Sequence, residues 1–189
     1  MFIAGCDEVG RGCLAGPVVS AVVIFHEDYY NKEIKDSKKL SKKKRQELYP
    51  VILENAVAYG IGVVCPIIID KINILNAVKH SMHLALSRLN HSYDKLIVDA
   101  VKLNHIKGDY IHPNKADDTY IQVSAASIIA KVYRDNLMDN LSLIYKEYKW
   151  EKNAGYGTKE HIEAIKQYGI TLVHRRSFLK NIVSHEYGK

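Results

Sequence analysis

Acidic residues that follow short apolar runs, or stand in a polar loop, carry the clearest chemistry in this sequence. There are five of them: Asp7, Glu8, Asp99, Asp117 and Asp118. Carboxylates that are brought together repel each other, which raises a pKa or requires a cation. Ligands that are all carboxylates select hard ions such as Mg²⁺ or Mn²⁺. The alternative interpretation is that these acids are ordinary solvated loop charges.

Asp7 and Glu8 are adjacent, which limits how both could reach one site. Neighbouring residues of a regular strand point to opposite faces of the sheet. We therefore expect the strand alternation to be interrupted at this point, and Gly10 and Gly12, which follow directly, permit such an interruption.

The glycine-rich turn at 10–16 reads Gly-Arg-Gly-Cys-Leu-Ala-Gly and leads into a strand. A dinucleotide-binding loop would lead into a helix, and no Walker A pattern occurs. Exposed N–H groups beside Arg11 can nevertheless hold one phosphate or sugar, because glycine lets the backbone approach closely.

The charge of the chain favours an anionic partner. There are 27 Lys and Arg against 21 Asp and Glu, a net charge of +6, and nucleic acid is the commonest such partner. Basic residues cluster at 38–45 and at 174–176. Both clusters are interpreted either as phosphate contacts or as solvated surface charge.

Hydrophobic patterning indicates which elements must position these groups. It predicts strands over 2–7, 17–25, 56–65 and 95–98, and helices over 41–55, 75–89, 123–148 and 158–168. The first two strands are expected to form a hairpin. Pro50 should kink or shorten the first helix. This order of elements indicates a mixed sheet with helices packed on it.

Size and composition limit the class of protein. A chain of 189 residues with 47% hydrophobic content predicts one globular domain. No apolar stretch approaches the length of a membrane span, and the N-terminus lacks the pattern of a signal peptide, so we expect a cytoplasmic protein. Three cysteines without CxxC spacing predict reduced thiols.

Seven ordered blocks of sequence resemble the bacterial type 2 ribonuclease H family, ribonuclease HII. They are Asp-Glu-Val-Gly-Arg-Gly at 7–12, Ala-Gly-Pro-Val at 15–18, Asp-Ser-Lys-Lys-Leu at 36–40, Lys-Ala-Asp at 115–117, Ser-Ala-Ala-Ser-Ile-Ile-Ala-Lys-Val at 124–132 with Arg134-Asp135, Gly-Tyr-Gly-Thr at 155–158 and His-Arg-Arg-Ser-Phe at 174–178. One departure is Cys13, which stands where many relatives have proline.

The resemblance implies an α/β protein with the ribonuclease H-like fold: a central mixed five-stranded sheet flanked by helices, with a helical C-terminal region from about residue 140. It implies one catalytic domain over 1–189. It also implies an endonuclease that cuts the RNA strand of RNA–DNA hybrids and nicks duplex DNA on the 5′ side of a single ribonucleotide. The expected products carry a 3′-hydroxyl and a 5′-phosphate.

The resemblance also implies the site residues. The metal-binding carboxylates of the family fall on Asp7, Glu8, Asp99 and Asp117, which would hold two divalent ions, Mn²⁺ or Mg²⁺. The expected substrate-binding residues are Gly10, Arg11, Gly12, Lys38, Lys39 and Tyr156. The turn at 10–12 would contact the ribonucleotide 2′-hydroxyl, and Tyr156 would stack beneath the neighbouring sugar.

Two other interpretations stay open. One is a different nuclease of the same fold, such as a ribonuclease HIII or a junction resolvase. The other is a non-catalytic module that binds hybrids, which would predict a missing carboxylate. The expected partners are RNA–DNA hybrid and ribonucleotide-containing duplex DNA, without membrane attachment. We expect a monomer, and a sliding-clamp contact is left open.

Overall fold

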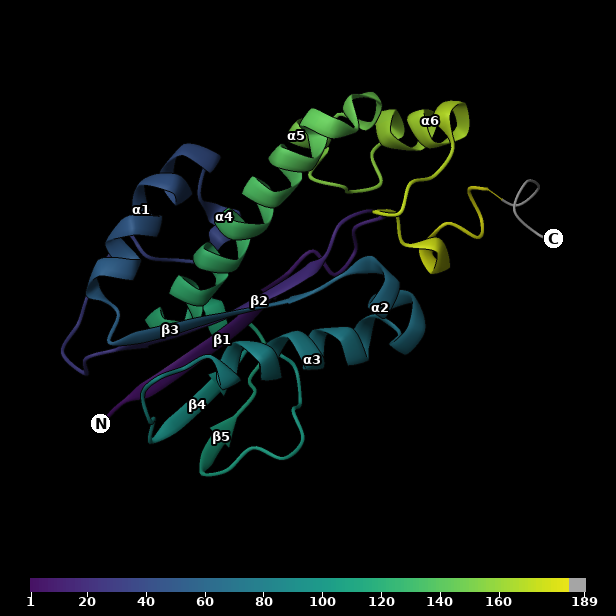
Figure 1. Ribbon diagram of the computed structural model, residues 1–189. Helices are drawn as coiled ribbons and strands as arrows, with labels where there is room; N and C mark the ends of the chain where they lie inside the picture. Colours follow the sequence, from purple (N-terminus) through teal and green to yellow (C-terminus); the bar gives the residue numbers. More distant parts are fainter. Residues whose placement is uncertain (184–189) are drawn as a thin grey trace.

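The computed structural model describes residues 1–183, and its centre is a mixed five-stranded sheet (Figure 1). The strands are β1 (Ile3–Val9), β2 (Val18–Phe25), β3 (Ala58–Val64), β4 (Lys95–Val98) and β5 (Asp109–Ile111). Their order is β3-β2-β1-β4-β5. The hairpin of β1 with β2 and the pairing of β2 with β3 are antiparallel, whereas β4 is parallel to both β1 and β5.

Helices cover both faces of this sheet. They are α1 (Lys42–Asn55), α2 (Pro66–Ile72), α3 (Ile74–Ser87), α4 (Ile121–Ile144), α5 (Trp150–Asn153) and α6 (Lys159–Tyr168). In Figure 1, α1 and α4 lie on one side of the sheet and α2 and α3 on the other. The mixed sheet flanked by helices confirms the predicted fold class.

The central strand β2 shows why the chain adopts two helical layers. Every residue of β2 is buried, and its alternate residues belong to two separate cores. Val19 and Ala21 pack with α1 and α4, whereas Val18 and Val22 pack with α3. A strand covered on both faces needs a nearly continuous apolar sequence instead of an alternating one.

Small residues let α4 approach the sheet closely beside the predicted carboxylates. A Cβ at Gly5 of β1 would meet the backbone of Gln122 and would overlap Val123. The next residues of α4 include Ala125 and Ala126, which are fully buried. This close packing places the first turns of α4 directly against β1.

Several predicted boundaries differ from the structure. α1 begins after its predicted N-cap, Ser41, and extends through Pro50 to Asn55, so the proline does not shorten it. The predicted helix over 123–148 ends at Ile144, and Lys149, with φ of +51°, separates the turn at 146–148 from α5. Hydrophobic patterning did not indicate α2 or β5.

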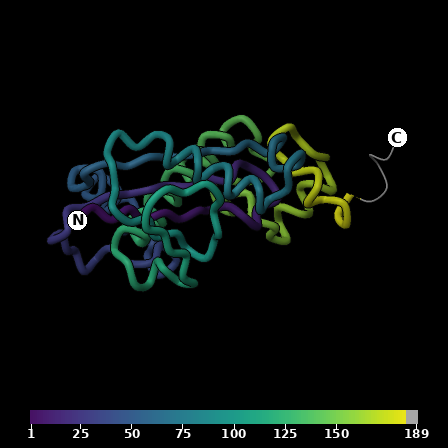
Figure 2. Tube along the Cα trace, turned by 90° about the horizontal axis from the view of Figure 1, so that it is seen from below, coloured from purple at the N-terminus to yellow at the C-terminus, as the bar shows by residue number. Residues whose placement is uncertain are grey.

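The C-terminal part of the described chain has its own small core. Trp150, Tyr148, Ile165 and Leu179 are buried there with the end of α4. This helical region lies at one end of the molecule, far from the N-terminus, in both views (Figure 2). Within residues 1–183, no helix is long and apolar enough to cross a membrane.

Candidate active site

The predicted carboxylates gather where β1 extends beyond the end of β4. The ladder between these strands ends at Cys6 and Val98, and the Asp99 N–H then donates to the Cys6 carbonyl at 3.1 Å. Asp7 and Glu8 therefore lie on a free edge of β1. The strand itself stays regular to Val9, so the expected interruption of the alternation is wrong. The two acids still influence each other, because the charge of Glu8 raises the pKa of Asp7.

Asp7 is buried on the α4 side of this edge. Its Oδ1 accepts the Glu8 N–H at 2.7 Å, the donor that β4 would otherwise occupy. Burial raises the pKa of Asp7 well above its usual value, and the charges of Glu8 and Asp99 raise it further, while the Ser127 hydroxyl lowers it by hydrogen bonding. The surroundings of Asp7 therefore disfavour the ionised carboxylate.

Glu8 has a carboxylate oxygen that lacks a partner in the described part of the chain. Within residues 1–183, its Oε2 is buried and has no hydrogen-bond partner. Its Oε1 lies 3.7 Å from the Arg11 guanidinium. Burial raises the pKa of Glu8 to about 6, against the lowering effect of Arg11 and with a further raising effect of Asp99. A buried, unpaired carboxylate oxygen calls for a cation or a proton.

Asp117 reaches the same edge from the short 3₁₀ turn at Ala116–Asp118. Asp99 holds this turn, because its Oδ1 accepts the Ala116 N–H at 2.7 Å. Burial raises the pKa of Asp117 to about 6, and the charges of Asp36 and Asp99 add to the effect. Lys38 Nζ approaches Asp117 to 3.9 Å.

Asp118, in contrast, points away from the edge. It forms an ion pair with Lys39 at the surface, and its pKa is lowered mainly by that hydrogen bond. Of the two neighbouring acids, Asp117 is therefore the one that lies buried at the acidic edge.

The four carboxylates lie along this edge, but they do not converge on a single metal-binding position. Within the described residues, no three His, Cys, Asp or Glu side chains are arranged so that they could hold one metal ion. Their chemistry still fits a hard dication: all donors are oxygens, one is buried and unpaired, and the pKa values of Asp7, Glu8 and Asp117 are all raised. Asp7 and Asp99 each accept one backbone N–H through Oδ1, from Glu8 and from Ala116.

The glycine turn lies next to this edge and contacts the segment that carries Tyr156. The N–H groups of Leu14 and Ala15 both donate to the Gly155 carbonyl, at 2.8 and 3.2 Å. The Tyr156 side chain is 39% exposed, and a hydrogen bond links it to the Cys13 thiol. Cys13, the departure from the family pattern, thus lies against the predicted stacking residue.

The interpretation of Arg175 as a phosphate contact or a solvated surface charge is also wrong. In the structure its guanidinium is fully buried and donates to backbone carbonyls of the glycine turn. Arg134 is buried in the same way. No periodicity marks such residues, since buried arginines look like surface residues in a sequence.

Comparison with known proteins decides the family. The model of the family described as Ribonuclease HII matches residues 4–181, nearly the whole chain. The chain belongs to the ribonuclease HII family. It is accordingly an endoribonuclease of the ribonuclease H type, a hydrolase.

Bacterial ribonucleases HII are similar along almost the full sequence. The protein of Clostridioides difficile is 49% identical over 183 residues, which cover 97% of this chain and 72% of that protein. The protein of Parabacteroides distasonis is 48% identical over 177 residues, covering 93% and 88%.

Several solved structures have a fold similar to that of this chain. The ribonuclease H2 of Pyrococcus horikoshii has a TM-score of 0.83 at 29% identity, covering 97% of this chain and 98% of that one. The ribonuclease HII of Archaeoglobus fulgidus, solved as a complex with PCNA, has a TM-score of 0.77 at 28% identity, covering 93% and 94%. A Bst ribonuclease HIII in complex with Mn²⁺ shares the fold at 18% identity and a TM-score of 0.72, covering 97% and 70%.

The raised pKa values of the acidic edge predict that the folded state loses stability as the pH rises. Glu8 and Asp117 hold protons more tightly in the folded state, so their contribution is complete below their ordinary values of 4.5 and 3.8. It is lost as the pH rises through about 6. In EDTA, we expect the midpoint of thermal unfolding to fall by roughly 3–6 °C between pH 5 and pH 7.5.

Differential scanning calorimetry with and without Mn²⁺ checks this. Added Mn²⁺ should restore the midpoint at pH 7.5 if the acids bind it. Glu8→Gln is the control, because a neutral amide removes one of the two titrating groups and should reduce the fall. An unfolding midpoint that rises from pH 5 to pH 7.5 in EDTA would contradict the prediction.

Proposed function

We propose that this enzyme hydrolyses the RNA strand of RNA–DNA hybrids and incises duplex DNA on the 5′ side of a single embedded ribonucleotide, leaving 3′-hydroxyl and 5′-phosphate ends. The observation that carries the proposal is the acidic edge of β1 standing next to a turn with free backbone donors. Hydrolysis needs the first, and recognition of a single 2′-hydroxyl needs the second.

Asp7, Glu8, Asp99 and Asp117 are proposed to hold two divalent ions, Mg²⁺ or Mn²⁺. Ions held there would supply Lewis-acid chemistry, namely activation of water and charge stabilisation at the leaving 3′-oxygen. The protein supplies the positions: the sheet edge holds Asp7 and Glu8, and the Asp99–Ala116 hydrogen bond fixes the turn that carries Asp117.

Substrate binding is proposed to use Gly10, Arg11, Gly12, Lys38, Lys39 and Tyr156. The backbone donors would contact the 2′-hydroxyl and the neighbouring phosphate without reading a base, so we expect little sequence preference. Lys38 pairs with Asp117 and Lys39 with Asp118. Both lysines are proposed to bind phosphates of the substrate. Affinity should therefore fall as the salt concentration rises.

Tyr156→Ala should weaken binding of a ribonucleotide-containing duplex by about tenfold, whereas Tyr156→Phe should bind nearly as wild type. The reason is that stacking on an aromatic face contributes roughly 1–3 kcal/mol and needs no hydroxyl. Fluorescence anisotropy with a labelled duplex measures the effect. Tyr59→Ala is the matched control, since Tyr59 is 43% exposed on the outer strand β3. An equal loss of affinity in Tyr156→Ala and Tyr59→Ala would show that Tyr156 is not part of the binding site.

The decisive test uses a labelled DNA duplex that carries one ribonucleotide, incubated with Mn²⁺, with Mg²⁺ and with EDTA. We expect a metal-dependent nick on the 5′ side of the ribonucleotide. Cleavage of a long RNA–DNA hybrid without that nick would indicate a nuclease that needs several ribonucleotides. Binding without any cleavage would favour the non-catalytic module.

The proposal includes one catalytic domain over 1–189, a monomeric state and action in the cytoplasm. Sedimentation of the free enzyme and of its complex with a short duplex tests the stoichiometry, for which we expect one protein per duplex.

A further inference from the structure

Two arginines are buried beneath the glycine turn. Arg134 on α4 and Arg175 near the C-terminal end are both fully buried. Within the described residues, neither forms an ion pair with a carboxylate. A charged group removed from water needs compensating hydrogen bonds, and both arginines find them on backbone carbonyls.

Arg175 contacts the turn at three points. Its Nη2 donates to the Gly10 carbonyl at 2.6 Å, its Nη1 to the Arg11 carbonyl at 3.0 Å and its Nε to the Gly16 carbonyl at 2.9 Å. These contacts use the rigid fork of the guanidinium, which a lysine ammonium cannot reproduce.

Because the peptide bond is planar, these contacts also fix the direction of the neighbouring backbone N–H groups. In a planar trans peptide, the C=O of one residue and the N–H of the next point in opposite directions, and no cis peptide occurs in the described chain. Because Arg175 draws the carbonyls of Gly10 and Arg11 inward, the N–H groups of Arg11 and Gly12 must point outward.

Those two N–H groups are free to bind a ligand. Arg11 and Gly12 are exposed, and within residues 1–183 neither backbone N–H donates to any acceptor. Adjacent outward donors form a small concavity that suits an oxygen atom with negative or partly negative charge.

We propose that Arg175 is a positioning residue that holds the N–H groups of Arg11 and Gly12 as a paired donor site, and thereby sets the preference for a ribose over a deoxyribose. This inference rests on the proposed function. Arg175 touches no substrate; it acts through the peptide planes of the turn.

Arg134 adds a second brace on the other side of the turn. Its guanidinium donates to the carbonyls of Ala15 at 2.9 Å, Pro17 at 2.8 Å and Ala154 at 2.7 Å. It therefore ties the end of the glycine turn to the segment that leads into Tyr156. This brace sets the distance between turn and tyrosine, whereas Arg175 sets the direction of the donors.

The test compares two duplexes that differ by a single 2′-hydroxyl. Their Kd values are measured by anisotropy in EDTA for wild type and for Arg175→Lys, so that no cleavage intervenes. We expect the ratio of the two Kd values to fall by about tenfold in Arg175→Lys, the loss of roughly one hydrogen bond. The Kd for the all-deoxy duplex should stay within about twofold.

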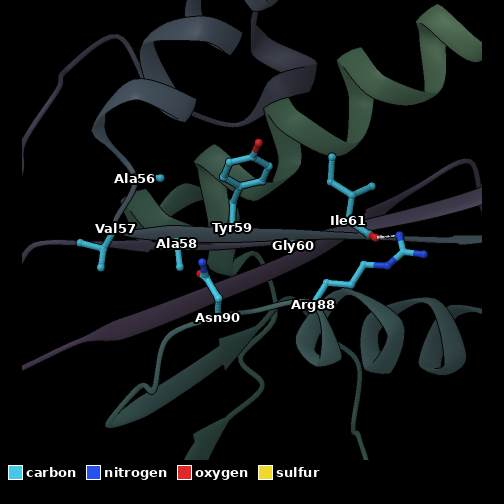
Figure 3. Close-up of a pocket in the computed structure, with 8 residues that line it drawn as sticks. All are labelled: Ala56, Val57, Ala58, Tyr59, Gly60, Ile61, Arg88 and Asn90. Carbon is cyan, nitrogen blue, oxygen red and sulfur yellow. Dashed lines mark hydrogen bonds between the residues drawn. The ribbon is translucent and has the colours of Figure 1, made fainter.

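Arg88→Lys is the matched control (Figure 3). Arg88 also donates to a backbone carbonyl, that of Ile61, but it lines a hollow of about 470 Å³ beside the outer strand β3. This hollow belongs to the opposite edge of the sheet from β4. The Kd ratio of Arg88→Lys should equal that of the wild type.

Three outcomes would overturn the inference. The first is a Kd ratio in Arg175→Lys that stays at the wild-type value. The second is a parallel weakening of both duplexes with a lowered Tm, which would leave Arg175 a purely structural role. The third is a wild type that binds both duplexes equally, which would contradict the proposed function itself and is recognised without any variant.

A measurement on the wild type covers the case in which Arg175→Lys does not fold. In an amide NMR spectrum, the N–H resonances of Arg11 and Gly12 should move when the ribonucleotide-containing duplex is added. They should move much less with the all-deoxy duplex. Equal movement with both duplexes would contradict the paired donor site.

Discussion

Asp99→Asn is expected to retain the fold and the affinity for a ribonucleotide-containing duplex while losing at least about 100-fold in kcat. The fold survives because Oδ1 of the new amide can still accept the Ala116 N–H, the bond that holds the turn carrying Asp117. Turnover is lost because a neutral amide is a poorer ligand for a hard dication, and the charge stabilisation that such an ion supplies is worth several kcal/mol.

Single-turnover incision at saturating enzyme concentration measures this loss without interference from product release. Asp118→Asn is the matched control, because Asp118 is the neighbouring acid that pairs with Lys39 at the surface. It should keep kcat within a few fold of the wild type. An Asp99→Asn protein with full activity would refute the assignment of the acidic edge.

Gly10→Ala is expected to lower the free energy of unfolding by at least about 3 kcal/mol and to abolish incision. Two costs combine at this position. Gly10 has φ of +88°, which costs an alanine roughly 1–2 kcal/mol. A Cβ there would also overlap Nε of the buried Arg134 and lie 2.7 Å from its Cδ. That guanidinium cannot retreat without breaking its three hydrogen bonds.

Alanine substitutions at two other glycines distinguish the cost of the positive φ from the cost of the overlap with Arg134, when the free energy of unfolding is measured in urea. Gly108 has φ of +89° but open space around its Cβ position, so Gly108→Ala should show the backbone cost alone. Gly12 has neither a positive φ nor a neighbour within 4 Å, so Gly12→Ala should keep nearly full stability. A Gly10→Ala protein as stable as Gly108→Ala would show that Arg134 is not fixed in place.

The sheet and the main helices could be predicted because their signals are local. The β-branched run of β2 and the N-cap of α1 at Ser41 were confirmed. β5 was missed because three residues, Asp109–Ile111, carry no period and form a strand only by pairing with β4. α2 is only seven residues long, and its one local signal is Pro66 at the first helical position.

The candidate site divides in the same way. The four carboxylates were predicted from their family motifs; the structure brings them to one edge, and their role stays a prediction. The interruption of the strand at Asp7 and Glu8 was predicted wrongly, because no local pattern in the sequence shows that β1 has a free edge beyond the end of β4 at Val98. The role of Arg175 could not be predicted, since burial of a charged side chain depends on carbonyls more than 150 residues away.

That distance along the chain has a consequence for how the enzyme is made. Gly10 and Arg175 are separated by 165 positions, so the ribosome makes the acids of β1 well before it makes the arginine that holds the glycine turn. A nascent or prematurely terminated polypeptide that stops before residue 175 carries all four acids but leaves the carbonyls of Gly10 and Arg11 unheld. On the proposed role of Arg175, such a polypeptide would lack the oriented pair of N–H groups and, with it, the preference for a ribose over a deoxyribose.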